Sequence, residues 1–305
     1  MTITAAICTR GRPELLRRAA ESLRRQSAVP FEILVVDNAP VDDLTRTLVS
    51  TLPDLRYVTE PLAGLDFARN RALREARGEV VAFLDDDAVA DARWAESLAR
   101  CFDAHPEAAV VTGRTEALSL AEPGQRIFEA NGGFGRGLAP ITLPDDAAAP
   151  LHGRSAPLIA WAVSVGSGAN FAVRRAVALE LGGFDESLDR GPSLPGGGDH
   201  DMLWRVLQAG HKVCYEPSAL AWHEHRAGLD EAYNQIVGHQ RGLIAFLVKS
   251  VRAARGRTRV SLMTFLAWRL FKPGARILRR IGGRDPLPIG VLFRMWWNCW
   301  RGLAA

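Results

Sequence analysis

The stretch VVAFLDDDA, residues 80–88, decides the fold, because five apolar residues run directly into three adjacent carboxylates, Asp85, Asp86 and Asp87. A short apolar run of this kind is typical of a strand in the centre of a sheet. Three neighbouring carboxylates repel one another unless cations neutralise them, and hard divalent cations favour oxygen ligands. A solvated acidic turn would explain such a triplet in isolation. Its position at the end of an apolar strand favours a metal site.

Similar apolar runs alternate with helical patterns through the first part of the chain. Strands are predicted at ITAAICT (3–9), EILVVDN (32–38), LRYVTE (55–60), EVVAFLDDD (79–87) and AAVVTG (108–113). Helical spacing of apolar residues follows at residues 13–26, 44–52, 66–77 and 92–105. This alternation implies an α/β fold with a largely parallel sheet and helices on both faces. Ligands bind such sheets beyond the carboxyl ends of the strands.

Polar residues end two further strands of this predicted sheet. Thr9 and Arg10 follow the first strand, and Pro13 is placed to begin a helix. Asp37 ends the second strand, where an aspartate is often only a turn or cap residue. Together with Thr9 and Arg10, it outlines a pocket across neighbouring strand ends.

A third acidic group lies in GGGDHDMLWR, residues 196–205. Asp199 and Asp201 precede a helix, so one of them could simply cap it. A carboxylate presented on a glycine-rich loop also suits a general base. AWHEHR follows, and although a single histidine is more often structural, His223 and His225 beside a carboxylate site favour a metal role.

The remainder of this region has a weaker pattern. Residues 120–160, interrupted by Gly, Pro and Ala, predict an irregular loop region with the character of a lid over a ligand. A further helix is expected to end at Gly210. Residues 212–225 predict two short strand-like pieces.

An ordered set of motifs resembles the family-2 glycosyltransferases of the GT-A fold over residues 2–226: TAAICTRGRP, ILVVDNAP, GLDFARNRAL, FLDDDA, GSGANFAVRR, GGFDE, GGGDHDMLWRVLQAG and ALAWHEH. The resemblance implies the nucleotide-diphospho-sugar transferase fold, α/β with a Rossmann-like mixed sheet. It divides the chain into a catalytic domain, residues 1–239, and a basic, Trp-rich helical extension, residues 240–305.

The resemblance also implies a role for single residues. Asp199 corresponds to the catalytic base and Asp87 to the direct metal ligand, while His223 completes metal or diphosphate binding, with His225 as the competing assignment. The positions implied to bind the nucleotide sugar are Thr9, Arg10, Asp37, Arg69, Asn70, Asp85, Asp86, Gly168, Asn170, Asp201, Trp204 and Arg205. One position departs from the family pattern, because Gly198 precedes the base where the family usually has Glu.

The implied activity is an inverting transfer of a sugar from a nucleotide-sugar donor to an acceptor hydroxyl. A divalent cation, Mg²⁺ or Mn²⁺, would neutralise the departing nucleoside diphosphate. The acceptor is expected to be a glycan or lipid-linked molecule in cell-surface glycan or glycolipid synthesis. The donor nucleotide and the oligomeric state are left open by the sequence.

Positive charge is concentrated at the C-terminus. Residues 240–305 contain 14 Arg or Lys and one acid, and four of the eight tryptophans lie in the last 38 residues. Amphipathic helices of this composition suit an anionic membrane surface, although packing on the catalytic domain would also use their apolar faces. No nucleic-acid motif accompanies the charge. No secretory signal, spanning segment or cysteine pair is found, which predicts a cytoplasmic protein bound peripherally to the inner membrane face.

Two alternative functions remain from the residues alone. Asp85, Asp87 and Val89 also fit the DxDx(T/V) pattern of a haloacid-dehalogenase-like phosphatase, but that pattern normally opens its fold. The second alternative is a pseudo-transferase that binds a nucleotide sugar without turnover, and the complete set of carboxylates argues against it.

Overall fold

A nine-stranded sheet forms the centre of the molecule, in the order β3-β2-β1-β4-β8-β6-β9-β5 with β7 paired to β9. The structure is a computed structural model that describes residues 1–27, 31–151, 153 and 155–305. The strands are β1 (Ile3–Thr9), β2 (Phe31–Asn38), β3 (Leu55–Glu60), β4 (Val80–Leu84), β5 (Ala88–Ala90), β6 (Ala108–Ala117), β7 (Ile141–Leu143), β8 (Asn170–Arg174) and β9 (Lys212–His223).

The sheet is mixed, which confirms what the family resemblance implies. The alternation of strands and helices by itself predicts a largely parallel sheet, and this holds for β1 to β4 and for β6 with β9 but fails at β8. Strands β1 to β4 pair in parallel, whereas β8 is antiparallel to both β4 and β6. The reason lies in the connection: Asn170, the first residue of β8, pairs with Leu84, the last residue of β4. The chain therefore enters β8 from the carboxyl edge of the sheet and must run in the opposite direction.

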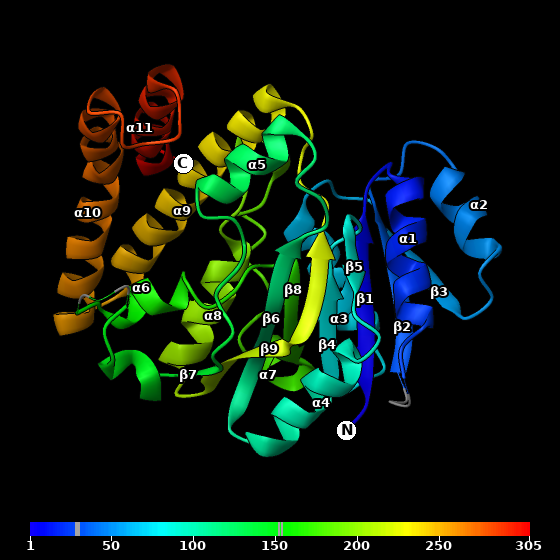
Figure 1. The fold of residues 1–305 in the computed structure, drawn as a ribbon. Helices are drawn as coiled ribbons and strands as arrows, with labels where there is room; N and C mark the ends of the chain where they lie inside the picture. Colours follow the sequence, from blue (N-terminus) through cyan, green and yellow to red (C-terminus); the bar gives the residue numbers. More distant parts are fainter. Residues whose placement is uncertain (28–30, 152, 154) are drawn as a thin grey trace.

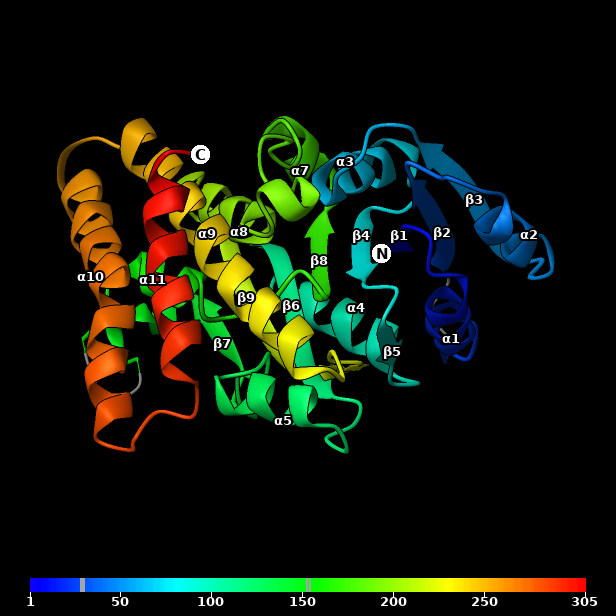
Figure 2. The same ribbon diagram turned by 90° about the horizontal axis from the view of Figure 1, so that it is seen from above.

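Helices cover both faces of the sheet, as predicted (Figures 1 and 2). One face carries α1 (Pro13–Arg24) and α4 (Trp94–Ala104), and the other carries α3 (Leu65–Glu75), α7 (Arg175–Glu180) and α8 (Gly198–Gln208). The strand alternation explains the two cores, since Ala5 and Ile7 pack toward α1 while Ala6 packs toward α3. Helix α2 (Leu44–Ser50) lies beside β3 at one end of the sheet.

The region from residue 120 to 160 is more regular than predicted. It contains α5 (Pro123–Ala130), β7, a 3₁₀ turn η1 (Asp145–Ala148) and α6 (Leu158–Ala162). Helix α5 begins with Pro123 in its first turn and a capping box between Glu122 and Gln125, which is a start signal that the sequence contains. A second 3₁₀ turn, η2 (Gly191–Ser193), precedes α8.

The two strand-like pieces predicted at residues 212–225 form one strand, β9. Its register against β6 shifts between Gly113 and Arg114, which pair with Glu216 and Leu220 respectively. An irregularity of this kind bends the strand without ending it.

Three long helices follow at the end of the sheet opposite α2 (Figures 1 and 2). They are α9 (Leu229–Ala253), α10 (Gly256–Ile281) and α11 (Ile289–Leu303). Leu262, Phe265 and Cys299 join the core that also holds β4 and α8, so α10 and α11 pack on the rest of the fold. The predicted boundary between residues 239 and 240 falls inside α9, and the division of the chain there stays a prediction. Within the described ranges, no helix is long and apolar enough to cross a membrane.

Candidate active site

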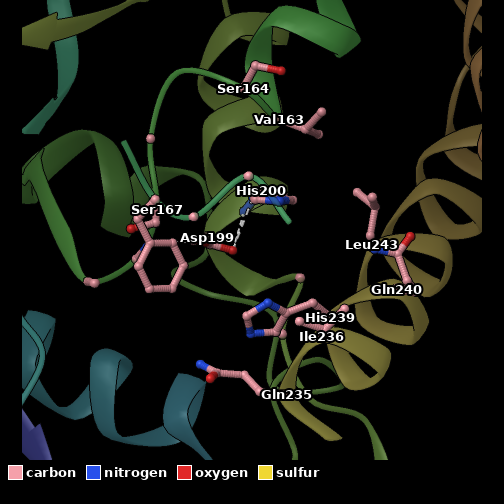
Figure 3. Close-up of a pocket in the computed structure, with 18 of the residues that line it drawn as sticks. Val163, Ser164, Ser167, Asp199, His200, Gln235, Ile236, His239, Gln240 and Leu243 are labelled. Atoms are coloured by element: carbon pink, nitrogen blue, oxygen red, sulfur yellow. Dashed lines mark hydrogen bonds and ion pairs between the residues drawn. The ribbon is translucent and has the colours of Figure 1, made fainter. Parts of the chain in front are cut away.

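A cavity of about 890 Å³ lies at the carboxyl ends of the central strands. The acidic triplet after β4, the loop before α8 and the facing sides of α9 and α10 line it. Figure 3 shows Asp199 and His200 at the start of α8 opposite His239 and Gln240 of α9. The cavity therefore joins two of the acidic groups that the sequence singles out, Asp85–Asp87 and Asp199.

Two members of the acidic triplet and one histidine form a group that fits a metal ion. Asp85, Asp87 and His223 each offer one ligand atom, and these atoms lie within 4.8 Å of one another. Two carboxylates and an imidazole suit Mg²⁺ or Mn²⁺. Strand pairing creates the group, because β5 follows the triplet directly and Ala88 pairs with His223 of β9.

Charge around this group keeps Asp87 ionised. Burial raises the pKa of Asp87, but His223, Arg12 and Arg226 lower it more, so its pKa is well below the usual value. His223 Nε2 lies 3.1 Å from Asp87 Oδ1, and Arg12 Nη1 lies 3.0 Å from Asp87 Oδ2. Burial and the neighbouring Asp87 raise the pKa of Asp85. A divalent cation would relieve this repulsion between the two carboxylates.

Asp86 has a different role from its neighbours. It accepts hydrogen bonds from Thr9 Oγ1 at 2.6 Å and pairs with Arg12 Nη2 at 2.8 Å. Burial raises its pKa to about 7. Asp86 therefore ties the end of β4 to the end of β1 and fixes the direction of the flanking carboxylates.

A chain of hydrogen bonds extends behind His223. His223 Nδ1 lies 3.1 Å from His225 Nδ1, and His225 Nε2 lies 2.7 Å from Glu129 Oε1 of α5. A carboxylate accepts only, so neutral His225 carries its proton on Nε2 and accepts at Nδ1. His223 then donates from Nδ1. Its Nε2 donates to Asp87 Oδ1 when the ring is protonated and would be free to ligate a metal ion once that proton is lost. Such outer partners commonly set the tautomer of a ligating histidine.

Asp199 is an ionised carboxylate at the start of α8. The backbone N–H groups of Gly168 and His200 each donate to it at 2.8 Å, and His200 Nδ1 lies 3.2 Å away. Burial raises its pKa, but His200, Arg69 and these two N–H groups lower it more. Asp199 is therefore able to accept a proton at neutral pH.

Two glycines beside Asp199 are required by close packing. A Cβ at Gly168 would overlap the Arg69 guanidinium, and a Cβ at Gly198 would overlap the Asp66 carboxylate. Arg69 Nη1 contacts Asp66 at 3.0 Å and Asp189 at 3.3 Å. The space where a side chain at position 198 would lie is thus taken by Asp66, which explains the departure from the family pattern there.

Comparison with known proteins now identifies the family. Residues 4–182, more than half of the chain, match the model described as Glycosyl transferase family 2. The chain belongs to this family. The GT-A-like fold, with Asp85 and Asp87 after β4 as candidate metal ligands, agrees with this family. It argues against the alternative of a haloacid-dehalogenase-like phosphatase.

Individual relatives extend the comparison of this chain. It is 30% identical over 232 residues to a pre-mycofactocin glycosyltransferase of Mycobacterium tuberculosis, covering 74% of the chain but 43% of that relative. It is 26% identical over 118 residues, 37% of the chain and 38% of the relative, to a glucosyl-dolichyl phosphate glucuronosyltransferase of Haloferax volcanii. The chain thus spans less than half the length of these relatives.

A solved structure shows the same fold. The mannosyltransferase PcManGT of Pyrobaculum calidifontis, in complex with GDP-Man and Mn²⁺, superposes with a TM-score of 0.63 at 16% identity. The superposition covers 99% of this chain and 86% of PcManGT. The likeness therefore includes the C-terminal helices.

Asp37 lies beside Thr9, since the two residues pair in register at the ends of β2 and β1. Its Oδ2 accepts from Tyr57 Oη at 2.8 Å, while its buried Oδ1 has no hydrogen-bond partner among the described residues. Burial raises the pKa of Asp37. An unpartnered buried oxygen is unusual and suits a ligand donor such as a ribose hydroxyl. Arg10 is exposed beside these strand ends.

Two predicted asparagines lie outside the cavity lining. Asn170 Nδ2 donates to the carbonyls of Arg114 and Ala219, and its Oδ1 accepts from Trp94 Nε1. Asn70 Oδ1 accepts a hydrogen bond from the Phe184 N–H, and Asn70 Nδ2 donates one to the Phe184 carbonyl. Their amide groups are used within the fold and hold the strands and loops that surround the cavity.

Three residues of α8 are likewise used within the fold. Asp201 pairs with Arg205 at 2.7 Å and with Lys249 at 2.6 Å, and Arg205 also donates to the carbonyls of Leu181 and Gly183. Trp204 is packed in the main core. These side chains orient α8, and hence Asp199, from its far side.

Several cavity residues were missed by sequence reasoning. Arg12 belongs to the quoted TRGRP motif and could have been found from it. His200 lines the cavity and Asp66 contacts Arg69 beside it, and both also lie inside quoted motifs, GGGDHDMLWRVLQAG and GLDFARNRAL. The others belong to no quoted motif and come together only through folding: Asp189, His239, Arg269 and Lys272 in the lining, and Glu129 behind His225.

Proposed function

We propose that this glycosyltransferase moves a sugar, with inversion at the anomeric carbon, from a nucleoside-diphosphate donor to a hydroxyl of a lipid-linked acceptor used in cell-surface glycan synthesis. The observation that carries this proposal is that Asp199 and the Asp85–Asp87–His223 group line one cavity. A general base and a site for the leaving diphosphate then lie within reach of the same sugar. The dolichyl-phosphate relative supports a lipid-linked acceptor.

The proposed reaction is a single displacement. Asp199 takes the proton of the acceptor hydroxyl as its oxygen bonds to the anomeric carbon. The bond from that carbon to the phosphate oxygen breaks at the same time, and its electron pair leaves with the nucleoside diphosphate. A divalent cation held by Asp85, Asp87 and His223 would supply neutralisation of the charge on that diphosphate. Since attack comes from the face opposite the leaving group, the configuration inverts.

Binding of the donor nucleotide is expected to depend on metal. A ligand that binds only the folded state stabilises it by about 2.7 kcal/mol when present at about 100 times its Kd. We therefore expect one nucleoside diphosphate, with Mn²⁺, to raise the Tm by several degrees, and much less without Mn²⁺. GDP is the first probe because PcManGT was solved with GDP-Man and Mn²⁺. An equal shift with EDTA present would contradict metal-dependent donor binding.

The outer face of α10 and α11 is proposed to lie on an anionic membrane surface. Phe271, Leu278, Phe293 and Trp297 are 52–72% exposed there, in a segment with a single acid. Apolar side chains among arginines favour the headgroup region of such membranes.

Flotation with vesicles containing phosphatidylglycerol measures this contact. Replacing Phe293 and Trp297 by alanine is expected to lower the floated fraction several-fold. The matched control replaces Val41 and Leu44, exposed apolar residues at the opposite end of the sheet, and should float like the wild type. Equal flotation of both double variants would contradict membrane contact through this face.

A further inference from the structure

The cavity has two ends of opposite charge. Asp85, Asp87 and Asp199 lie on the side of the strand ends and the start of α8. On the other side, α10 contributes Arg269, Lys272 and Arg276 to the lining. In the proposed displacement, Asp85 and Asp87 hold the metal ion and Asp199 is the general base. The cations of α10 have no role in that reaction.

Among the described residues, Arg269 and Lys272 have no acidic partner. Arg276, one turn further along α10, is neutralised by Asp285 through two contacts of 2.7 Å. Within the described part of the chain, Arg269 instead donates to the neutral Gln240 at 3.0 Å, and its buried Nε has no acceptor. Lys272 forms no ion pair in that part of the chain, and its Nζ lies 5.0 Å from the centre of the Trp268 ring.

The uncompensated charge has an electrostatic cost. Removal from water, together with the neighbouring Arg269, Arg276 and Arg279, lowers the pKa of Lys272 to about 8. Removal from water likewise lowers the pKa of Arg269 to about 10. Cations withdrawn from water are normally paired, and here they repel each other. An anion in the cavity would relieve both effects.

Polar, uncharged groups lie between the two ends. Gln235 and His239 project from α9 toward the side of the cavity that holds Asp199 (Figure 3), and Gln240, the next residue, accepts the hydrogen bond from Arg269 of α10. Amides and an imidazole suit the hydroxyl groups of a sugar. The order along the cavity is therefore a base, a polar wall and a cationic end beside the Trp268 ring.

We propose that Arg269 and Lys272, with Trp268, bind a phosphate or diphosphate group of the acceptor, whose sugar then extends along α9 so that its hydroxyl reaches Asp199. This inference rests on the proposed function and assigns the acceptor subsite to the C-terminal helices. The phosphate of the donor lies at the metal group instead, since that group is formed by β4 and β9. In either case the bound group is a phosphate ester, carried by a lipid or by a small sugar.

Isothermal titration of the full-length protein tests this subsite. Saturating GDP and Mn²⁺, or whichever nucleotide raises the Tm, keeps the donor site filled. The lipid probe is farnesyl phosphate, and the small-anion probe is inorganic phosphate. Farnesol, which has the same hydrocarbon chain without the phosphate, is the uncharged control. An R269Q and Lys272→Ala double variant is expected to weaken farnesyl phosphate binding at least about tenfold, since hydrogen bonds to charged groups contribute about 1.5–3 kcal/mol.

Controls separate charge at this position from damage to the fold. Lys272→Arg keeps the cation and should bind within a few-fold of the wild type. Arg259→Ala removes an exposed cation of α10 that does not line the cavity, and it should not change the affinity. Both are compared after the cooperative unfolding transition of each variant has been verified.

The outcomes divide clearly. Tighter binding of farnesyl phosphate than of inorganic phosphate, with both weakened in the double variant, supports a lipid-linked acceptor. Equal affinity for the two anions supports a small phosphate ester at the same subsite. Wild-type affinity in the double variant would overturn the assignment, as would displacement of farnesyl phosphate by GDP and Mn²⁺. Failure of the proposed function would show separately, as the absence of any nucleotide-dependent rise in Tm.

Discussion

Replacing Asp199 by asparagine is expected to lower kcat for sugar transfer by about 10³-fold, since a positioned general base contributes about 10²–10⁴-fold. The amide has nearly the same shape, but it cannot accept the proton of the acceptor hydroxyl. The lowered pKa of Asp199 means that the wild-type carboxylate is already ionised at neutral pH. Steady-state transfer with the best donor from the Tm panel measures the loss.

The matched control is Asp201→Asn, two residues further along α8. Asp201 lies outside the cavity lining and pairs with Arg205 and Lys249. Its loss should destabilise the fold by about 1–3 kcal/mol, because the buried position 201 would lose charge-assisted hydrogen bonds to the partly exposed Arg205 and Lys249, while kcat of the folded enzyme changes only a few-fold. If Asp199→Asn kept kcat within tenfold of the wild type, Asp199 would not be the base.

The product of the same assay tests the stereochemistry. A single displacement requires an inverted anomeric configuration, which proton NMR of the product determines. A product with the configuration of the donor would contradict the proposed displacement. The pseudo-transferase alternative predicts nucleotide binding without any turnover in the wild type.

The second large effect is expected from Asp87→Asn, which should lower kcat/KM by about 10³-fold. An amide carries no charge to hold a divalent cation, and stabilisation of the leaving diphosphate contributes several kcal/mol. Because an amide oxygen binds the cation weakly, raising the Mn²⁺ concentration should restore little activity. Activity as a function of Mn²⁺ concentration, at saturating donor, measures both quantities.

Glu129→Gln should give a smaller effect on the same metal titration. Glu129 acts through His225 on the tautomer of His223, and loss of such an outer partner typically costs about 10–100-fold in metal affinity or activity. High Mn²⁺ should therefore restore most of the activity, which a purely structural defect would not allow. Glu180→Gln, an exposed acid on α7, is the control. An unchanged Mn²⁺ requirement in Glu129→Gln would show that the histidine chain does not support the metal.

Local sequence patterns account for much of the site. Apolar runs ending in polar residues placed Thr9, Asp37 and Asp85–Asp87 at the carboxyl edge of the sheet, and the structure places them there because β1, β2 and β4 run in parallel. The same patterns missed the reversal of β8, since the direction of a strand depends on where its connection enters the sheet.

Whether a polar residue of a motif faces the cavity or is hydrogen-bonded within the fold depends on segments elsewhere in the chain. Asn170 and Arg205 belong to sugar-binding motifs by resemblance, yet their donors are taken up by backbone carbonyls from β6, β9 and the loop after α7. A polar side chain faces a ligand or a buried carbonyl according to which distant segment packs against it. The residues next to it in the sequence do not determine which of the two occurs.

By itself, the sequence determined the α/β class, the strand ends that carry carboxylates, the presence of a helix beside Asp199 and the concentration of positive charge after residue 240. These features depend on residues close together in the chain, whose spacing and polarity act locally. The predicted start of that helix was wrong, because α8 begins at Gly198 with Gly197 as its N-cap, and Asp199 and Asp201 lie inside it. Only the tertiary structure decided which of these groups share a cavity: His223 beside Asp87, Glu129 behind His225, and the unpaired cations of α10 across from Asp199. Such contacts join segments that are far apart in the chain, and they form because burial of the apolar faces brings those segments together.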